Sequence, residues 1–213
     1  MADIRSKEEY YTEFKLNETN KLNEALKYAH DIRKFEIDLY WKRATYFWTF
    51  IGATFAGYFA LLAGNNKPDS DMLFLLNCLG FAFSLSWFFV NRGSKVWQEN
   101  WEKHVDMLED AIVGPLYKTT IKNTVSKWNI VRQRGFSASK INELLSLYIC
   151  LIWILLSSRM ICNIYHWNEP FEGFNIVIFG VITLIFMAVL YRKGLTSGNN
   201  ESIVFEKRDL PLG

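Results

Sequence analysis

Apolar residues are concentrated in four long blocks that are separated by polar segments. The blocks cover residues 46–64, 72–90, 144–165 and 174–191, and Arg159 is the only charged residue in them. Each block approaches the ~20 apolar residues that an α-helix needs to cross the ~30 Å hydrocarbon core of a bilayer. Buried helices of soluble proteins are usually amphipathic instead. The pattern therefore predicts an all-α integral membrane protein with four transmembrane helices.

The polar segment before the first block also has a helical pattern. From about Thr19 onward its apolar residues follow spacings of three and four, which is typical of a narrow packing stripe: Ala25, Tyr28, Ile32, Phe35 and Leu39. No Pro or Gly separates this stripe from the first block, so one continuous helix is expected from about residue 20 to residue 64. The stripe packs either against the chain's own middle segment or between subunits.

The middle polar segment, 91–143, carries a second apolar face with the same spacing. Its members are Trp97, Trp101, Val105, Leu108 and Ile112. The pattern ends at Gly114-Pro115, a strong helix stop. We expect this face to meet the stripe of the N-terminal helix and form a cytoplasmic helical bundle.

The distribution of Lys and Arg orients the spans. Residues 1–45 hold nine, 91–143 nine and 192–213 four, whereas the connections 65–71 and 166–173 together hold one basic and four acidic residues. Basic loops stay on the cytoplasmic side, so both termini should be cytoplasmic. The expected order is an N-terminal helix, a transmembrane hairpin, a cytoplasmic helical segment, a second hairpin and a tail, with bounds 1–45, 46–90, 91–143, 144–191 and 192–213.

Composition changes this picture little. Of 213 residues 50% are hydrophobic and 22% charged, and the net charge is +2. These averages resemble those of a soluble protein, because the apolar blocks and the highly charged segments offset each other in the mean. They argue against a disordered chain and against a strongly basic nucleic-acid-binding protein. The three cysteines lie inside the blocks without metal-site spacing: Cys78, Cys150 and Cys162.

The first block contains a ladder of small residues, one at every fourth position: Gly52, Ala56, Ala60 and Gly64. A second small pair, Ala53 and Gly57, is offset by one. Small residues let helix backbones approach closely, which drives helix association in lipid. The ladder predicts helix packing, either within the subunit or between subunits.

Arg159 is a candidate functional residue because charges inside the membrane are costly and usually have a role. In a pore it would line or gate the path. It also lies near the predicted outer end of its span, so its stem can snorkel outward. In that case an outer ion pair is expected with Asp69, Asp71 or Glu169.

The cytoplasmic face around Trp97, Trp101 and His104 is a second candidate. Trp101 and His104 share a helix face, which suits aromatic packing or a cation–π contact, and a ligand-sensing pocket is the alternative. Phosphate-loop, dinucleotide, zinc-protease and serine-hydrolase motifs are absent from the sequence. We therefore expect no enzyme activity, no cofactor and no metal.

Three runs carry a family resemblance: WKRATYFWTFIGATFAGYFALL (41–62), SWFFVNRGSKVWQENWEKHVDMLED (86–110) and GPLYKT (114–119). They resemble the bacterial RipA-type octameric membrane proteins. The resemblance implies an inner-membrane ring of eight subunits, with the first two spans and their cytoplasmic extensions at its centre.

Pattern and resemblance together predict a homo-oligomeric, octameric protein of the bacterial inner membrane that forms a pore or pore-like cavity gated by a cytoplasmic signal. The alternative is a non-conducting scaffold that docks a cytoplasmic partner. Expected partners are further copies of the chain, membrane lipids and a cytoplasmic protein or small-molecule regulator. Nucleic acid is not expected.

Overall fold

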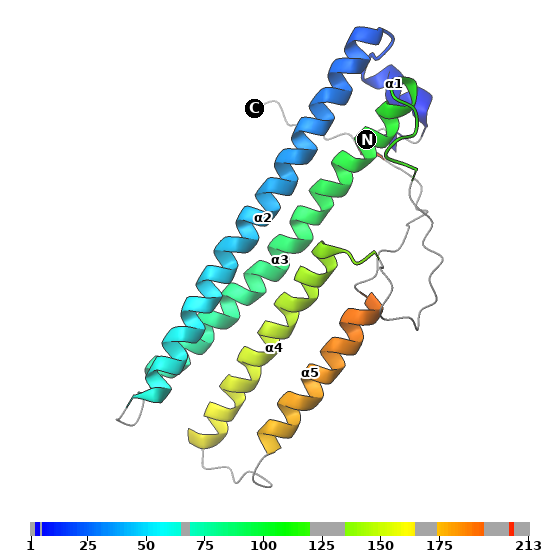
Figure 1. The fold of residues 1–213 in the computed structure, drawn as a ribbon. Coiled ribbons are helices and arrows are strands. Elements are labelled where there is room, and N and C mark those ends of the chain that lie inside the picture. Colours follow the sequence, from blue (N-terminus) through cyan, green and yellow to red (C-terminus); the bar gives the residue numbers. More distant parts are fainter. Residues whose placement is uncertain are drawn as a thin grey trace. The chain divides into compact units, whose positions relative to one another are not determined.

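The structure, a computed structural model, describes residues 3–4, 6–64, 69–119, 135–164, 174–193 and 205–206. In order, its elements are β1 (Asp3–Ile4), α1 (Lys7–Glu13), α2 (Thr19–Ala63), α3 (Ser70–Leu108), the 3-10 turn η1 (Glu109–Ala111), α4 (Ala138–Ile164), α5 (Phe174–Lys193) and β2 (Phe205–Glu206) (Figure 1). The strands are a single antiparallel pair of two residues each. The predicted all-α class is confirmed. Expectations for the 166–173 connection and most of the tail fall outside the described residues.

The four apolar blocks lie in α2, α3, α4 and α5. Within the described residues, three helical stretches are long and apolar enough to cross a membrane. They are Thr19–Ala63, Ser70–Ala111 and Ala138–Cys162. The continuous helix expected from about residue 20 to residue 64 is confirmed by α2, because no helix breaker interrupts this stretch.

The chain divides into two compact units. The first, here called the charged unit, comprises Met1–Asp38, Val96–Asn129 and Ser197–Gly213. The second, the apolar unit, comprises Leu39–Lys95 and Ile130–Thr196. Both α2 and α3 contribute residues to each unit.

The core of the charged unit is formed where α2 and α3 pack together and α1 covers them. Its buried residues are Tyr10, Leu16, Leu22, Leu26, Ala29, Val105 and Leu108. The residues that α2 buries are therefore not those of the predicted stripe. Tyr28 is 67% exposed and Phe35 is 59% exposed, while Ala25 packs at the edge of the core. Tyr28 and Phe35 thus do not pack against the chain's own middle segment, because smaller aliphatic residues on the neighbouring face of α2 pack against α3. Packing of the stripe between subunits stays a prediction.

Helix α1 is absent from the sequence-based expectations, although the sequence carries its start signal. The Ser6 hydroxyl accepts a hydrogen bond from the Glu9 N–H at 3.1 Å, and the Glu9 carboxylate accepts one from the Ser6 N–H at 3.3 Å. This reciprocal pair is a capping box, which satisfies two otherwise unpaired amides at a helix N-terminus. The Ser-x-x-Glu spacing could have revealed the helix.

In the apolar unit α3 buries one residue every three or four positions, which is the spacing of a coiled-coil seam. The buried positions are Leu73, Asn77, Gly80, Ser84, Trp87, Asn91 and Ser94. At Gly80 a Cβ atom would overlap the indole of Trp153 in α4. The missing side chain thus allows α4 to press its fully buried Trp153 against the backbone of α3.

Polar contacts join the helices near one end of the apolar unit. The Asn142 amide of α4 donates to the Tyr40 hydroxyl of α2 at 2.9 Å, and the Arg43 guanidinium donates to the Ser94 hydroxyl at 3.1 Å. Helix α5 contacts α4, where Tyr148 and Thr183 share a hydroxyl hydrogen bond of 2.8 Å. These bonds fix the neighbours of each helix.

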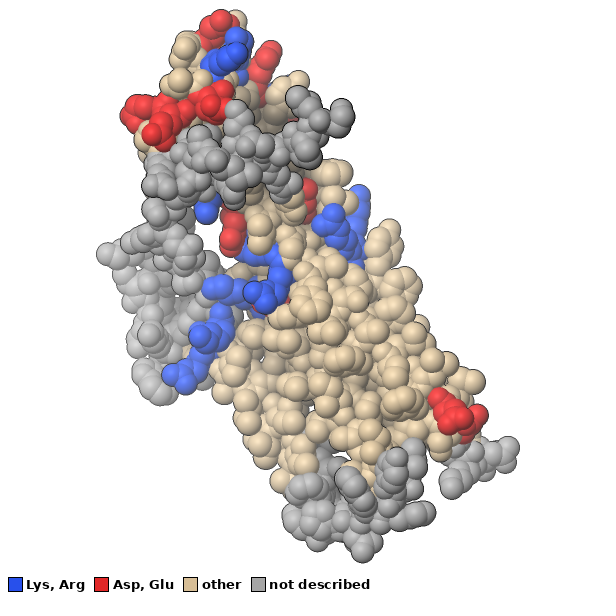
Figure 2. Space-filling model, turned by 180° about the vertical axis from the view of Figure 1, so that it is seen from behind, with Lys and Arg blue, Asp and Glu red and all other residues tan. Residues whose placement is uncertain are grey.

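The charges of the apolar unit are sorted by position. Apart from Arg159, its described basic residues lie at one end of the helices, where Glu143 pairs with Arg92: Lys42, Arg43, Arg92, Lys95, Lys140, Arg192 and Lys193. Asp69 and Asp71 stand at the start of α3, at the opposite end. Figure 2 shows blue basic side chains at one end of the tan apolar surface and red acidic side chains at the other. This asymmetry is the one that the positive-inside rule describes.

Candidate functional site

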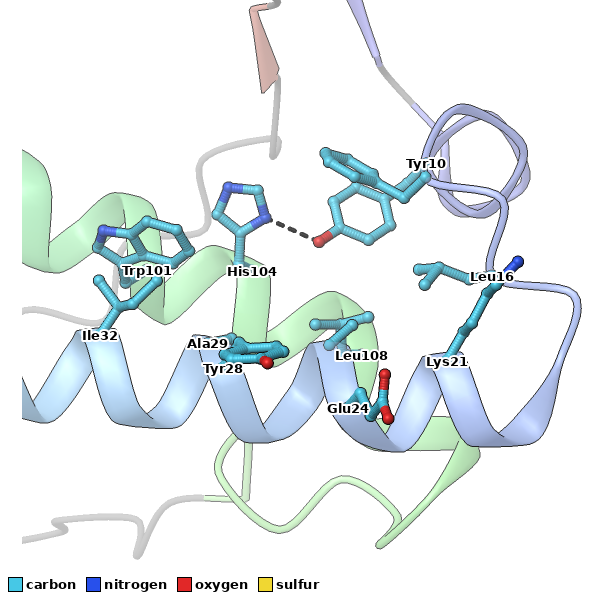
Figure 3. A pocket seen from close by; sticks show the side chains of 12 residues that line it. Tyr10, Leu16, Lys21, Glu24, Tyr28, Ala29, Ile32, Trp101, His104 and Leu108 are labelled. Atoms are coloured by element: carbon cyan, nitrogen blue, oxygen red, sulfur yellow. Dashed lines mark hydrogen bonds between the residues drawn. The ribbon is translucent and has the colours of Figure 1, made fainter.

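A cavity of about 490 Å³ opens in the charged unit beside the predicted face of α3. Residues from α2, from α3 and from the segment around α1 line it: Tyr10, Phe14, Leu16, Lys21, Glu24, Ala25, Tyr28, Ala29, Ile32, Trp101, His104 and Leu108. Figure 3 shows His104 and Tyr10 across the space from Tyr28 and Glu24 of α2. Such a volume lies in the range of small-molecule pockets.

His104 lies at the centre of an aromatic cluster. Its Nδ1 atom is 2.7 Å from the Tyr10 hydroxyl oxygen, and its ring centroid is 5.1 Å from that of Trp101 and 6.0 Å from that of Phe14. Burial lowers the pKa of His104 and, with the nearby Tyr11, raises the pKa of Tyr10. Both groups are therefore neutral at pH 7, and the cluster presents aromatic surface without a positive charge of its own.

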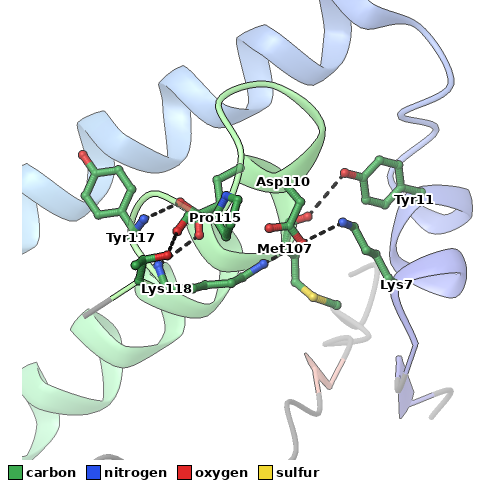
Figure 4. Close-up of polar contacts among 9 residues, drawn as sticks. Lys7, Tyr11, Met107, Asp110, Pro115, Tyr117 and Lys118 are labelled. Carbon is green, nitrogen blue, oxygen red and sulfur yellow. Dashed lines mark hydrogen bonds and ion pairs between the residues drawn. The ribbon is translucent and has the colours of Figure 1, made fainter. Parts of the chain in front are cut away.

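Helix α1 is held on α3 by polar contacts at its other side (Figure 4). The Tyr11 hydroxyl donates to the Met107 carbonyl at 3.3 Å. The Asp110 carboxylate accepts from Lys118 at 2.7 Å and from Lys7 at 2.9 Å, and these two bonds lower the pKa of Asp110. Because α1 supplies Tyr10, these contacts also hold one wall of the cavity.

Glu109, just after the end of α3, binds the backbone of the chain reversal that follows. Its side chain is fully buried and accepts hydrogen bonds from the backbone N–H groups of Tyr117 at 2.7 Å and Lys118 at 3.2 Å (Figure 4). The intervening reversal passes through Gly114 with φ at +73°, a conformation that favours glycine. The carboxylate thus pairs with amides that the reversal would otherwise leave unpaired.

The structure brings together two of the three residues of the predicted cytoplasmic face. Trp101 and His104 both line the cavity, whereas Trp97 is 41% exposed and does not line it. Sequence reasoning missed Tyr10 and Phe14, which come from the segment around α1. The capping box at Ser6 was the available signal for that segment.

The small-residue ladder lies mainly on the exposed side of α2. Gly52, Ala56, Ala60 and Gly64 are exposed, and a Cβ at Gly52 would have no neighbour within 4 Å. Gly57 differs, since its Cβ would lie 3.7 Å from Leu76 of α3. Gly57, the offset residue, therefore packs against the chain's own second span. The ladder residues instead form an exposed surface of α2 from which no large side chains project.

Arg159 lies on the exposed surface of α4, five residues before the helix ends at Ile164. Among the described residues it forms no ion pair, so neither Asp69 nor Asp71 is its partner here. Glu169, the third expected partner, lies outside the described residues. The same part of the chain contains no cluster of three or more His, Cys, Asp or Glu arranged for a metal ion.

The fold and its apolar helices define an all-helical membrane protein. Residues 23–162 match the model of the octameric membrane protein family (8xMP), which covers well over half of the chain. The chain belongs to this family, and the resemblance found in the sequence is confirmed. Membership in an octameric family implies that the protein associates with copies of itself. No curated protein and no solved structure matches the chain.

Proposed function

We propose that the protein forms a ring of eight subunits in the bacterial inner membrane and that the ring encloses a pore gated from the cytoplasm. It acts without enzymatic chemistry, α5 is a fourth span, and both termini are cytoplasmic. The exposed small-residue ladder on α2 carries this proposal. The sorted charges of the apolar unit support the orientation.

The ladder supports subunit contacts because lipid supplies no hydrophobic force between helices. Close backbone approach at small residues then provides the packing energy. Gly52, Ala56 and Ala60 are apolar, small and exposed on a helix of a self-associating family. A neighbouring subunit's helix therefore has room to approach at this strip.

The experiment replaces two small residues of the ladder with larger leucines. We expect Ala56→Leu combined with Ala60→Leu to convert the detergent-solubilised octamer into smaller species, measured by native mass spectrometry. The matched control is Ala188→Leu, an exposed small residue of α5 that lies outside the ladder. An octamer that persists in the ladder variant would contradict the assignment of this interface.

Ion flux in proteoliposomes tests the pore itself. Wild-type octamers should release a trapped ion faster than empty liposomes, and the ladder variant should not. A stable octamer without flux, with or without cytoplasmic extract, would instead favour the scaffold.

One observation favours that alternative scaffold. Large apolar residues are exposed close to the ladder on α2: Phe50, Phe59 and Leu62. If they line the central axis, the cavity fills with lipid and excludes water. The octamer would then organise a membrane patch and dock a cytoplasmic partner, and no flux would be measured.

A further inference from the structure

We propose that the cavity of the charged unit binds a small organic cation through an alkylated ammonium group. Aromatic rings attract such cations with their electron-rich faces, and quaternary ammonium ligands are commonly held in aromatic cages. Four rings beside His104 line this cavity: Tyr10, Phe14, Tyr28 and Trp101. This inference does not rest on the proposed pore.

The shape of the site suits a ligand of this size. Its floor is made of buried residues, since Tyr10, Ala29 and Leu108 are each at most 3% exposed. Its rim is made of exposed rings, since Phe14 is 47% and Tyr28 is 67% exposed. A ligand that enters would therefore cover apolar aromatic surface that the chain leaves open to water.

The charges at the rim select a cation. Glu24 is the only carboxylate that lines the cavity, and it forms no ion pair within the described residues. Lys21, the one basic residue among the described lining residues, is paired with Glu18 at 3.7 Å. Glu24 thus remains as the uncompensated charge, and Figure 3 shows it beneath the ring of Tyr10 on the α2 side of the space.

The state of the aromatic cluster is compatible with a bound cation. His104 is engaged with Tyr10 at 2.7 Å, and burial lowers the pKa of its imidazole, so it does not repel a positive ligand at pH 7. Rings that are hydrogen-bonded and packed lose little freedom when a ligand binds. The site is therefore largely preformed.

Isothermal titration of the full chain in maltoside micelles tests the proposal. Choline is the probe, and 3,3-dimethylbutanol, which has nearly the same shape without the charge, is its control. We expect choline to bind with a Kd of about 1 mM or tighter, at least about fivefold more tightly than the neutral alcohol. Equal binding of both compounds, or absence of choline binding, would overturn the proposal.

Two variant pairs locate the binding. Tyr28→Leu should weaken choline binding about fivefold, whereas Phe35→Leu, which changes another exposed aromatic residue of α2 outside the cavity, should leave it unchanged. Glu24→Gln should weaken binding of choline but not of the alcohol, with Asp38→Asn as the matched charge control. Equal losses within either pair would place binding elsewhere and contradict the assignment.

The ammonium group has two candidate sources, a free metabolite and a lipid headgroup. Titration of choline in micelles measures the first. Incorporation into nanodiscs of phosphatidylcholine, compared with nanodiscs of phosphatidylglycerol, measures the second through protection of Tyr28 from chemical modification. Choline binding in micelles is required by the proposal. Protection of Tyr28 in phosphatidylcholine nanodiscs then identifies the headgroup as the source, and its absence identifies a free metabolite. Because neither readout involves ion flux, a non-conducting ring leaves the result interpretable.

Discussion

Glu109 is the one charged residue among the buried side chains of the described part of the chain. Its carboxylate accepts from two backbone amides at the reversal after α3. Burial of a charge is tolerated when hydrogen bonds replace its water. The role of Glu109 is thus to hold the Gly114 reversal and, through it, Lys118, which bonds Asp110.

Replacement of Glu109 should loosen this reversal. Glu109→Ala leaves the amides of Tyr117 and Lys118 without their acceptor, at a cost of about 1–3 kcal/mol. Hydrogen exchange of the peptide covering residues 112–119 should therefore speed up by about fivefold or more. Glu109→Gln keeps one acceptor oxygen and should show a smaller effect. Unchanged exchange in the Ala variant would show that the buried bonds do not hold the reversal.

At the scale of elements, the contact between α3 and α4 depends on a single glycine of α3. Gly80 lies under the indole of Trp153, whereas Gly93, on the same helix, has open space where a Cβ would stand. Both are helix-interior glycines, and a hydropathy pattern treats them alike. Only the position of α4 separates a required glycine from a replaceable one.

The two glycines therefore predict opposite outcomes. Gly93→Ala should stabilise α3, because alanine is favoured over glycine in helix interiors by about 1 kcal/mol. Gly80→Ala forces overlap with Trp153, and overpacking of this kind costs about 1–3 kcal/mol. The thermal unfolding midpoint in detergent, followed by near-UV circular dichroism, should rise for the first variant and fall for the second. Shifts of the same sign would contradict the α3–α4 contact.

At the scale of the whole molecule, the sorted charges predict a fixed orientation in the membrane. Asp38 and Asp71 are both exposed, and they lie on opposite sides of the first apolar block. In a background without the native cysteines, a membrane-impermeant maleimide should label Asp71→Cys in intact spheroplasts. It should label Asp38→Cys only after permeabilisation. The reverse labelling pattern would invert the proposed topology.

Much of the helical fold followed from local pattern. The extent of α2 was predictable because no Pro or Gly separates its polar N-terminal part from the apolar block, so the helix continues with its backbone hydrogen bonds satisfied internally. The membrane class was predictable because block length and missing charge are direct properties of sequence. Trp101 and His104 were found by their shared helix face, although their partner Tyr10 was not.

The sequence by itself determined the all-helical membrane class, the extent of α2 and the asymmetry of charge, since each depends on residues that are neighbours along the chain. Tertiary structure alone decided which face of α2 is buried, that Tyr10 reaches His104, and that Gly80 receives Trp153. Adjacent helix faces of α2 both carry apolar residues at spacings of three and four, so periodicity cannot separate them. Their environments differ only because α1 and α3 pack against one face and leave Tyr28 open.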